Sequence, residues 1–553
     1  MSSQVPSKEP WRLTAAEVLP LLRTGQLTVT DYVKSLLERI QARDPTVKAW
    51  VWIEPSLILQ RAKELDGLPT EERGPLHGLP IAVKDVILTK DMPTQYNSRL
   101  YNSETPVAID ANCVITLRAS GALIFGKTTT TEFACSKQGD WHQNLTSNAR
   151  DPKRTPGGSS SGSGAAVADC QIPVGLGTQT GGSIMRPASF NGCYGFKPTH
   201  GAISREGLAQ WSPLLDTLGF FGRSIDDFEV LADAFRLKDD EAVASEPFKL
   251  KGARIGFCKT HNWPKAGQGT IDAMKKARDI LHAHGAEIEE VELPDDFAHV
   301  LDWHAAVLAG EGHTSFLGQY LLDKDKLHES IVGYVDNTRE LTHRQLLDAY
   351  DNVARLRPVF DDLARNYDLI LTPSVLDEAP LGLENTGDMS MASMWTILHV
   401  PVINVTGFSG ANGAYCVLRR VSVRSLSGRA GGAVLCSKIF RGGDSSDLSG
   451  SQSIALDHSH SVNTWREQEL AHGALDNQRT TSSESKTARP SCTRLATIPK
   501  SRGIAMKGLR QTLVVTSYLQ ICSQHSTWGT ASSHVDPART RSRFGHQSLY
   551  EAQ

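Results

Sequence analysis

The feature that most constrains the fold is a long alternation of short apolar runs and helical patterns between Gly74 and Val405. Short apolar runs bounded by turn residues are typical of buried strands, whereas the intervening segments repeat apolar residues at helical spacing. Strands that alternate with helices over such a length indicate a large sheet covered by helices on both faces. The sequence therefore predicts an α/β fold with a large central β-sheet.

The individual elements follow from the same patterns. The expected strands are 81–84, 122–125, 254–257, 287–293, 367–371 and 400–405. The expected helices of this core are 112–120, 164–169 and 270–284, and the small residues of 164–169 predict a helix that approaches neighbouring backbone closely.

The first seventy residues are expected to be helical. Thr14 and Glu17 have the spacing of a capping box, which predicts a helix start. Apolar residues fall on one face of a helix over 31–42, and 55–65 predicts a third helix. The predicted organisation is an N-terminal helical region, 1–70, that packs on a core at 71–413.

Composition changes after Gly413. Residues 414–553 carry 18 Lys and Arg against 9 Asp and Glu, a net charge of +9, whereas the whole chain carries −3. This segment is rich in Ser and Arg, and only 511–519 has a convincing strand pattern. We expect a low-complexity basic tail that is disordered. Out-of-frame or unspliced coding sequence is the favoured origin, and a tail that contacts nucleic acid or an acidic partner is the alternative.

Several classes of protein are disfavoured. No apolar run reaches the ~18 residues of a membrane span, and residues 1–10 lack the apolar core of a signal peptide. The nine cysteines are scattered without CxxC spacing, which argues against a zinc site or a disulfide framework. Dispersed arginines with few aromatic residues between them argue against a nucleic-acid partner. A cytoplasmic protein is expected, and a homodimer is left open.

Three residues have settings that suit nucleophilic catalysis. Lys84 ends an apolar run, Ser159 opens a Gly/Ser tract, and Ser183 closes Gly177-Thr-Gln-Thr-Gly-Gly-Ser183. Serine is a poor nucleophile until a base takes its proton, and glycines allow backbone amides to approach an oxyanion. A lysine at the end of a buried strand loses hydration, which lowers its pKa and allows it to act as the base.

These motifs resemble the amidase signature family. The matching segments are 74–85, 121–128, 155–160, 177–183, 195–199, 216–219, 371–373 and 379–380, and the resemblance covers roughly residues 10 to 413. It implies the amidase signature fold, with a large mixed central sheet. Each motif alone also has a common non-catalytic interpretation: a lysine at the end of a strand is usually solvated, and Gly/Ser tracts are usually linkers.

The resemblance also implies a Ser-cisSer-Lys triad. Ser183 falls on the nucleophile, Ser159 on the bridging serine and Lys84 on the base. The oxyanion hole falls on the backbone amides of Thr180, Gly181, Gly182 and Ser183. The substrate would be a small-molecule amide, and no metal or organic cofactor is expected.

Two formal matches to other motifs are rejected. Residues 121–128 fit a P-loop pattern, but the apolar centre of this segment predicts a strand whose amides are already paired. Residues 158–162 fit a nucleophile elbow, but they follow a loop rather than a strand. His77, His142 and His200 lie near the motifs and are interpreted as loop residues.

The chain departs from the family pattern at three places. Gln179 stands where Asp is frequent, and Met185 stands where Arg is usual, so that Arg186 is expected to stabilise the loop instead. After Gly413 the family's next strand and closing helix are not recognisable. Uncovering several hundred Å2 of sheet would cost on the order of 10 kcal/mol.

Three functions are therefore considered. The first is an amidase that hydrolyses a small carboxamide through a serine acyl-enzyme. The second is the glutamine-hydrolysing A subunit of a tRNA amidotransferase, which would need partner subunits. The third is an inactive or misfolded amidase-like protein. Segments 303–316 and 391–399 are expected to line the substrate pocket, although no residue there specifies the substrate.

Overall fold

The structure is a computed structural model that describes residues 8–101, 103–135, 145–237, 249–410 and 418–421. The strand expected at 511–519 and most of the predicted tail lie outside these residues. None of the helices in these ranges combines the length and apolar character needed to cross a membrane.

The strands of the described residues form one mixed sheet of 11 strands, in the order β1-β3-β2-β4-β6-β5-β10-β11-β9-β7-β8. Pairing is parallel for β3-β2-β4 and β9-β7-β8, and antiparallel elsewhere. The bounds are β1 Trp50–Trp52, β2 Pro80–Lys84, β3 Leu123–Thr128, β4 Val174–Gln179, β5 Tyr194–Lys197, β6 Thr217–Gly222, β7 Arg254–Phe257, β8 Glu287–Glu290, β9 Leu369–Pro373, β10 Val402–Val405 and β11 Leu418–Val421.

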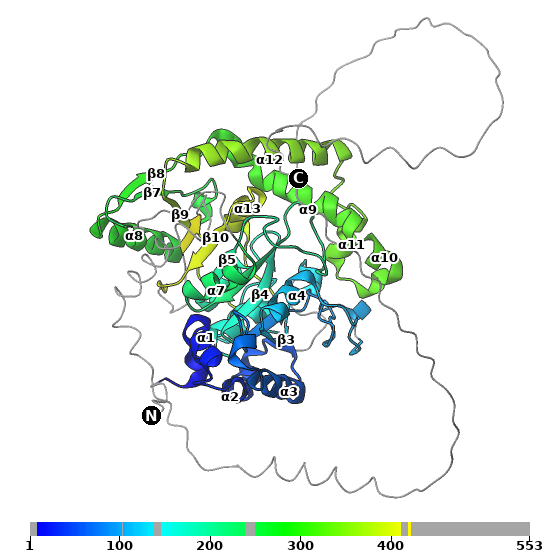
Figure 1. Ribbon diagram of the computed structural model, residues 1–553. Helices are drawn as coiled ribbons and strands as arrows, with labels where there is room; N and C mark the ends of the chain where they lie inside the picture. Colours follow the sequence, from blue (N-terminus) through cyan, green and yellow to red (C-terminus); the bar gives the residue numbers. More distant parts are fainter. Residues whose placement is uncertain (1–7, 102, 136–144, 238–248, 411–417, 422–553) are drawn as a thin grey trace, which may run out of the picture. The chain divides into compact units, whose positions relative to one another are not determined.

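Helices flank this sheet, as the sequence predicts (Figure 1). Their bounds are α1 Ala15–Thr24, α2 Val29–Val47, α3 Pro55–Asp66, α4 Asn112–Ala119, α5 Ser161–Ala168, α6 Met185–Asn191, α7 Asp226–Ala234, α8 Gln268–Ala283, α9 Val300–Ser315, α10 Leu317–Asp323, α11 Glu329–Val335, α12 His343–Ala364 and α13 Ser390–Ile397. The expected mixed α/β fold is confirmed.

The small-residue helix packs as closely as the sequence predicts. All residues of α5 are buried, and the helix contacts β2, β3, β4 and β6. A Cβ on Gly162 would lie 2.2 Å from the carbonyl oxygen of Ala49, and one on Gly164 would lie 2.8 Å from Pro187. The helix begins at Ser161, three residues before the expected start. This close packing fixes the segment that follows Ser159.

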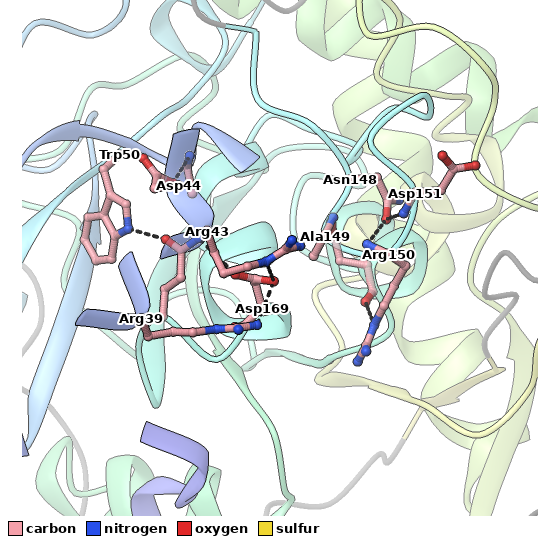
Figure 2. A network of polar contacts seen from close by, with 12 residues as sticks. Arg39, Arg43, Asp44, Trp50, Asn148, Ala149, Arg150, Asp151 and Asp169 are labelled. Atoms are coloured by element: carbon pink, nitrogen blue, oxygen red, sulfur yellow. Dashed lines mark hydrogen bonds and ion pairs between the residues drawn. The ribbon is translucent and has the colours of Figure 1, made fainter. Parts of the chain in front are cut away.

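The N-terminal helices form as expected and contact the core. Thr14 and Glu17 make the predicted capping box at the start of α1. The guanidinium groups of Arg39 and Arg43 on α2 both donate to Asp169 Oδ1 at 3.1 Å (Figure 2). These ion pairs join α2 to the turn that leads into β4.

Asp44 makes the stability of this region dependent on pH. Its Oδ1 accepts a hydrogen bond from the Ala49 amide at 2.7 Å. Burial raises the pKa of Asp44 to about 6, against the lowering effect of that bond. The folded chain therefore binds a proton here more strongly than the unfolded chain, so stability falls as pH rises from about 4 to 6.

Asp44→Asn should flatten this dependence because the amide keeps an acceptor oxygen and carries no charge. Ionised Asp44 costs the folded state on the order of 3 kcal/mol at neutral pH, since its pKa rises from 3.8 to about 6 and one pKa unit corresponds to about 1.4 kcal/mol. We expect the variant to melt roughly 2–4 °C higher at pH 7 and to match wild type near pH 4. Melting curves between pH 4 and 7.5 measure both, and identical slopes for the two proteins would contradict the assignment.

Strand β11 lies between β10 and β9 and pairs antiparallel with both. It joins β9, β7 and β8 to the rest of the sheet. The strand falls within the range 414–553 that the sequence assigns to the tail. The sheet pairing of the described residues therefore extends to Val421.

Candidate active site

Lys84 is the buried centre of the site. It is the last residue of β2, and its side chain is fully buried. Its Nζ donates to Ser159 Oγ at 2.7 Å and to Thr178 Oγ1 at 2.8 Å. Burial lowers the pKa of Lys84 well below its usual range, the nearby Arg186 charge adds to this, and Asp216 opposes it. A neutral amine beside a serine hydroxyl can accept its proton.

Ser159 lies at the end of an irregular loop that is held from both sides. The peptide bond between Gly158 and Ser159 is cis. Thr131 donates its amide to the Ser159 carbonyl at 3.3 Å. Gly157 has φ +76°, and a Cβ there would lie 2.9 Å from the Pro187 nitrogen, so only glycine fits without displacement. The expected cis serine is therefore present in the structure.

Two asparagines tie the loop before Ser159 to α6. Asn148 Nδ2 donates to the carbonyls of Thr155 and Phe190, and its Oδ1 accepts from the Arg150 amide at 2.9 Å, a bond shown in Figure 2. Asn191 on α6 donates to the Pro156 carbonyl at 2.7 Å. These bonds fix the loop against the helix that follows Ser183. The sequence predicts the loop but gives no signal for these contacts.

Ser183 is buried in the segment between β4 and α6. Its carbonyl accepts from the Ser160 amide at 3.4 Å, which brings it to the end of the Ser159 loop. Gln179 Oε1 accepts from the amides of Ile184 and Met185 at 2.8 and 3.0 Å. Within the described residues, no hydrogen bond joins the hydroxyls of Ser159 and Ser183. The structure thus brings the side chains of Lys84 and Ser159 into direct contact. It brings Ser183 close to the same loop through a backbone hydrogen bond.

The backbone of the segment around Ser183 contains amides that are free to donate hydrogen bonds within the described residues. Among the described residues, the amides of Gly181, Gly182 and Ser183 have no hydrogen-bond acceptor. A Cβ on Gly181 would lie 2.5 Å from Met389 Sδ, and one on Gly182 would lie 3.0 Å from the Ala392 side chain. Glycine therefore allows this segment to lie directly against the start of α13. Unpaired amides in a buried segment suit the binding of a negatively charged oxygen.

Asp216 holds the start of this segment. Its Oδ1 accepts from Thr180 Oγ1 at 2.7 Å, and its Oδ2 accepts from the amides of Trp211 and Ser212 at 2.9 and 3.0 Å. Burial raises the pKa of Asp216, although these hydrogen bonds oppose the shift. The sequence identifies 216–219 as a family motif but assigns Asp216 no role.

Arg186 joins three segments of the site. It is buried, and burial lowers its pKa to about 10. Its Nη2 donates to the Gly158 carbonyl at 2.9 Å, and its Nη1 donates to the Gly387 carbonyl. These contacts agree with the expectation that Arg186 stabilises the loop although it stands one position later than usual.

In the described part of the chain, neither rejected motif has the backbone structure that its function requires. Residues 123–128 form β3, whose backbone pairs in parallel with β2, with one register shift between Ile81 and Ala82. Lys127 makes a buried ion pair with Asp85 at 2.9 Å, which fixes its amine away from any phosphate role. Ser161 begins α5 directly after a loop, with no strand before it.

Of the histidines near the motifs, His77 and His200 make no hydrogen bond to Lys84, Ser159 or Ser183 in the described chain. Neither ring nitrogen of the buried His77 has a hydrogen-bond partner in the described chain. His200 stacks on His399 with ring centroids 4.0 Å apart. His142 lies outside the described residues. No group of three or more metal-ligating side chains occurs in the ranges that the structure describes.

Two helices lie against the segment 180–182. His304 on α9 contacts the Thr180 carbonyl, and Met389 and Ala392 at α13 contact Gly181 and Gly182. These helices carry the segments 303–316 and 391–399 that are expected to line the pocket. The sequence predicts the two segments but gives no signal for the contact of His304 with Thr180.

Comparison with known proteins gives consistent matches. The family model Amidase matches residues 31–415. The A subunit of glutamyl-tRNA(Gln) amidotransferase from Symbiobacterium thermophilum is 39% identical over 297 residues, which cover 51% of this chain and 61% of that protein. The chain thus spans about six tenths of the length of this relative in the match.

Solved structures show the same similarity. A crystal structure of an amidase superposes with a TM-score of 0.68 at 28% identity, covering 77% of this chain and 98% of the other. The peptide amidase of Stenotrophomonas maltophilia superposes with a TM-score of 0.65 at 25% identity, covering 78% of this chain and 96% of the other.

Proposed function

Because this chain belongs to the amidase signature family, whose members cleave carbon–nitrogen bonds, we propose that it hydrolyses a small carboxamide through an acyl-enzyme on Ser183. The observation that carries the proposal is the 2.7 Å contact between the buried amine of Lys84 and the hydroxyl of Ser159. A buried neutral lysine that contacts a serine hydroxyl can take its proton and so activate a nucleophile. Ser183 is the proposed nucleophile because its backbone is hydrogen-bonded to the loop that carries Ser159.

The proposed reaction begins when Ser183 Oγ attacks the substrate carbonyl carbon. Its proton passes to Ser159 Oγ while the proton of Ser159 passes to Lys84 Nζ. The carbonyl oxygen becomes an oxyanion that accepts from the amides of the 180–183 segment. When the tetrahedral intermediate collapses, the C–N bond breaks and the nitrogen leaves with the proton returned from Lys84 through Ser159.

Water completes the reaction by the same route. It loses a proton through Ser159 to Lys84 as its oxygen bonds to the acyl carbon. The ester bond to Ser183 then breaks, and Ser183 Oγ recovers the proton. The products are a carboxylic acid and ammonia or an amine, and the proton relay returns to its starting state.

A small uncharged amide fits the surroundings of the site. The side chains closest to Gly181 and Gly182 are those of Met389, Ala392, Ser393 and His304, with the guanidinium of Arg186 bound to backbone carbonyls. Burial lowers the pKa of His304 to about 4, so its ring is neutral at physiological pH. Apart from Arg186, whose Nη1 and Nη2 are bound to backbone carbonyls, these neighbours are uncharged, which favours an uncharged substrate over one with an amino and a carboxylate group.

The second candidate is the glutamine-hydrolysing A subunit of a tRNA amidotransferase. The identity of 39% to a protein of that name supports it. This function would require partner subunits. A cytoplasmic setting is part of both proposals, and the free cysteines at 113, 135, 170, 193 and 258 agree with a reducing compartment.

Ammonia release by the purified full-length chain separates these functions. We expect turnover of simple aliphatic or aromatic carboxamides without added protein, and little turnover of glutamine. Glutamine hydrolysis that exceeds that of simple amides would favour the second candidate. Absence of turnover together with absence of labelling by a fluorophosphonate probe would exclude the first candidate and leave either an A subunit that lacks its partner subunits or the inactive protein.

A further inference from the structure

The carbonyl groups of the segment around Ser183 are all engaged, in contrast to its amides. His304 Nε2 donates to the Thr180 carbonyl at 3.0 Å, and Thr396 Oγ1 donates to the Gly181 carbonyl at 2.6 Å. The Arg186 amide donates to the Gly182 carbonyl at 2.9 Å. The first two donors are side chains from α9 and α13, more than a hundred residues later in the sequence.

Because a peptide unit is planar, a contact that fixes its carbonyl group also fixes the direction of its amide group. The carbonyl of Thr180 and the amide of Gly181 belong to one planar unit, and in a trans unit the two groups point in opposite directions. A donor that fixes the carbonyl therefore fixes the direction of the amide. Thr396 acts in the same way on the unit that joins Gly181 to Gly182. Glycine needs such external support because its backbone has the widest conformational freedom.

We propose that His304 and Thr396 are positioning residues that hold the Gly181 and Gly182 amides in the direction required to bind the oxyanion. The inference rests on the proposed function, since it concerns the transition state of that reaction. Neither residue needs to touch the substrate.

The hydrogen bond of His304 determines which of its ring nitrogens carries a hydrogen. A carbonyl oxygen only accepts, so Nε2 carries a hydrogen. The ring lies close to the backbone it supports, because a Cβ on Gly181 would be 3.5 Å from His304 Cε1. Burial lowers the pKa of His304 to about 4, and the bond to Thr180 opposes this shift. The neutral ring therefore donates from Nε2 across the working pH range.

Thr396 is itself oriented by a second side chain. Gln179 Nε2 donates to Thr396 Oγ1 at 3.0 Å, while Gln179 Oε1 accepts from the amides of Ile184 and Met185. The Thr396 proton has a 2.6 Å acceptor at Gly181 and a 3.3 Å alternative at the Ala392 carbonyl. The shorter bond is favoured because the hydroxyl has only one proton. Gln179 and Thr396 thus support the segment on both sides of Ser183.

The test compares substitutions that keep or remove the donor. His304→Gln places an amide near the position of Nε2, whereas His304→Leu has no donor. Thr396→Ser keeps the hydroxyl, and Thr396→Val removes it with little change of shape. We expect kcat to fall about 10- to 100-fold in the Leu and Val variants with KM within about 3-fold, since loss of an oxyanion donor itself costs about 100- to 1,000-fold. The Gln and Ser variants should recover most of kcat.

Two matched controls separate positioning from packing. His77 and Thr372 are buried, and their side-chain polar atoms have no hydrogen-bond partner in the described chain. His77→Leu and Thr372→Val should leave kcat within about 2-fold. If His304→Leu fails to fold, the Thr396 pair still decides the question, because Val and Thr are nearly isosteric.

Distinct outcomes bear on the inference and on the proposed function. Wild-type kcat in both donor-free variants, or an equal loss in the Ser and Val variants, overturns the positioning role while amide hydrolysis by wild type stands. Wild-type protein without turnover on any amide overturns the proposed function itself. The rate of fluorophosphonate labelling provides a second readout, and it should fall in parallel with kcat.

Discussion

Ser183→Ala is expected to lower kcat for carboxamide hydrolysis by at least about 10,000-fold, because no acyl-enzyme can form without the Ser183 hydroxyl. Ser183 is buried, and its side chain makes no hydrogen bond to another described residue. Its replacement by alanine should therefore leave the melting temperature nearly unchanged. Labelling by a fluorophosphonate probe, read by intact mass, should disappear with the activity.

Ser189→Ala is the matched control for this variant. Ser189 lies on α6, six positions after Ser183, and is fully buried with no hydrogen-bond partner for its Oγ in the described chain. Its alanine variant should keep kcat within about 2-fold and remain labelled. If Ser183→Ala kept a tenth or more of wild-type turnover, the nucleophile would have to be another residue.

The sequence predicts the strands of this sheet where their residues are aliphatic. Segment 81–84 is a strand with almost the expected bounds, because Ile81 and Val83 at a spacing of two have few alternatives in a buried core. Segment 254–257 also has the expected bounds, although it contains Gly256. β4, β5 and β6 were identified only as motifs. Their glycines weaken the strand pattern in the sequence. The reason why glycine is required becomes clear only in the packed structure, where a Cβ on Gly219 would lie 2.2 Å from the Phe196 carbonyl oxygen.

The position of β11 could not be predicted for a different reason. Its sequence, Leu418 to Val421, contains two adjacent arginines and follows a change in composition, so nothing local favours a central strand. Its pairing partners β9 and β10 are consecutive strands separated by residues 374–401, and β11 lies between them only in the folded sheet. Non-local pairing of this kind leaves little trace in local sequence.

The candidate site shows the same division. The positions of Lys84, Ser159 and Ser183 follow from motifs, and the structure places the first two in contact. Thr178, which accepts the second Lys84 hydrogen bond, lies inside a quoted motif without a predicted role. His304 and Thr396 are ordinary helix residues in sequence. Their contacts depend on how α9 and α13 pack, which a single sequence does not reveal.

Lys84→Met is expected to lower kcat by about 1,000-fold or more while Lys84→Arg recovers little. Met fills a similar volume but removes the base, and general bases contribute about 100- to 10,000-fold. Arg keeps a cation whose pKa is too high to lose its proton at neutral pH, so it cannot accept the proton of Ser159. Stopped assays of ammonia release measure both variants, and melting curves exclude unfolding as the cause.

The pH dependence of the wild-type enzyme provides the matching test. Only neutral Lys84 can act as a base, so kcat/KM should rise with pH through the pKa of this amine and then level off. Burial lowers the pKa of Lys84, so the rise should lie well below pH 10.5, the ordinary value for lysine. A rise centred near pH 10.5, or an unchanged profile with normal kcat in Lys84→Met, would show that another group takes the proton. If a small primary amine in solution restores part of the activity of Lys84→Ala, the missing function is proton transfer, because an amine in solution replaces neither a buried contact nor a fixed charge.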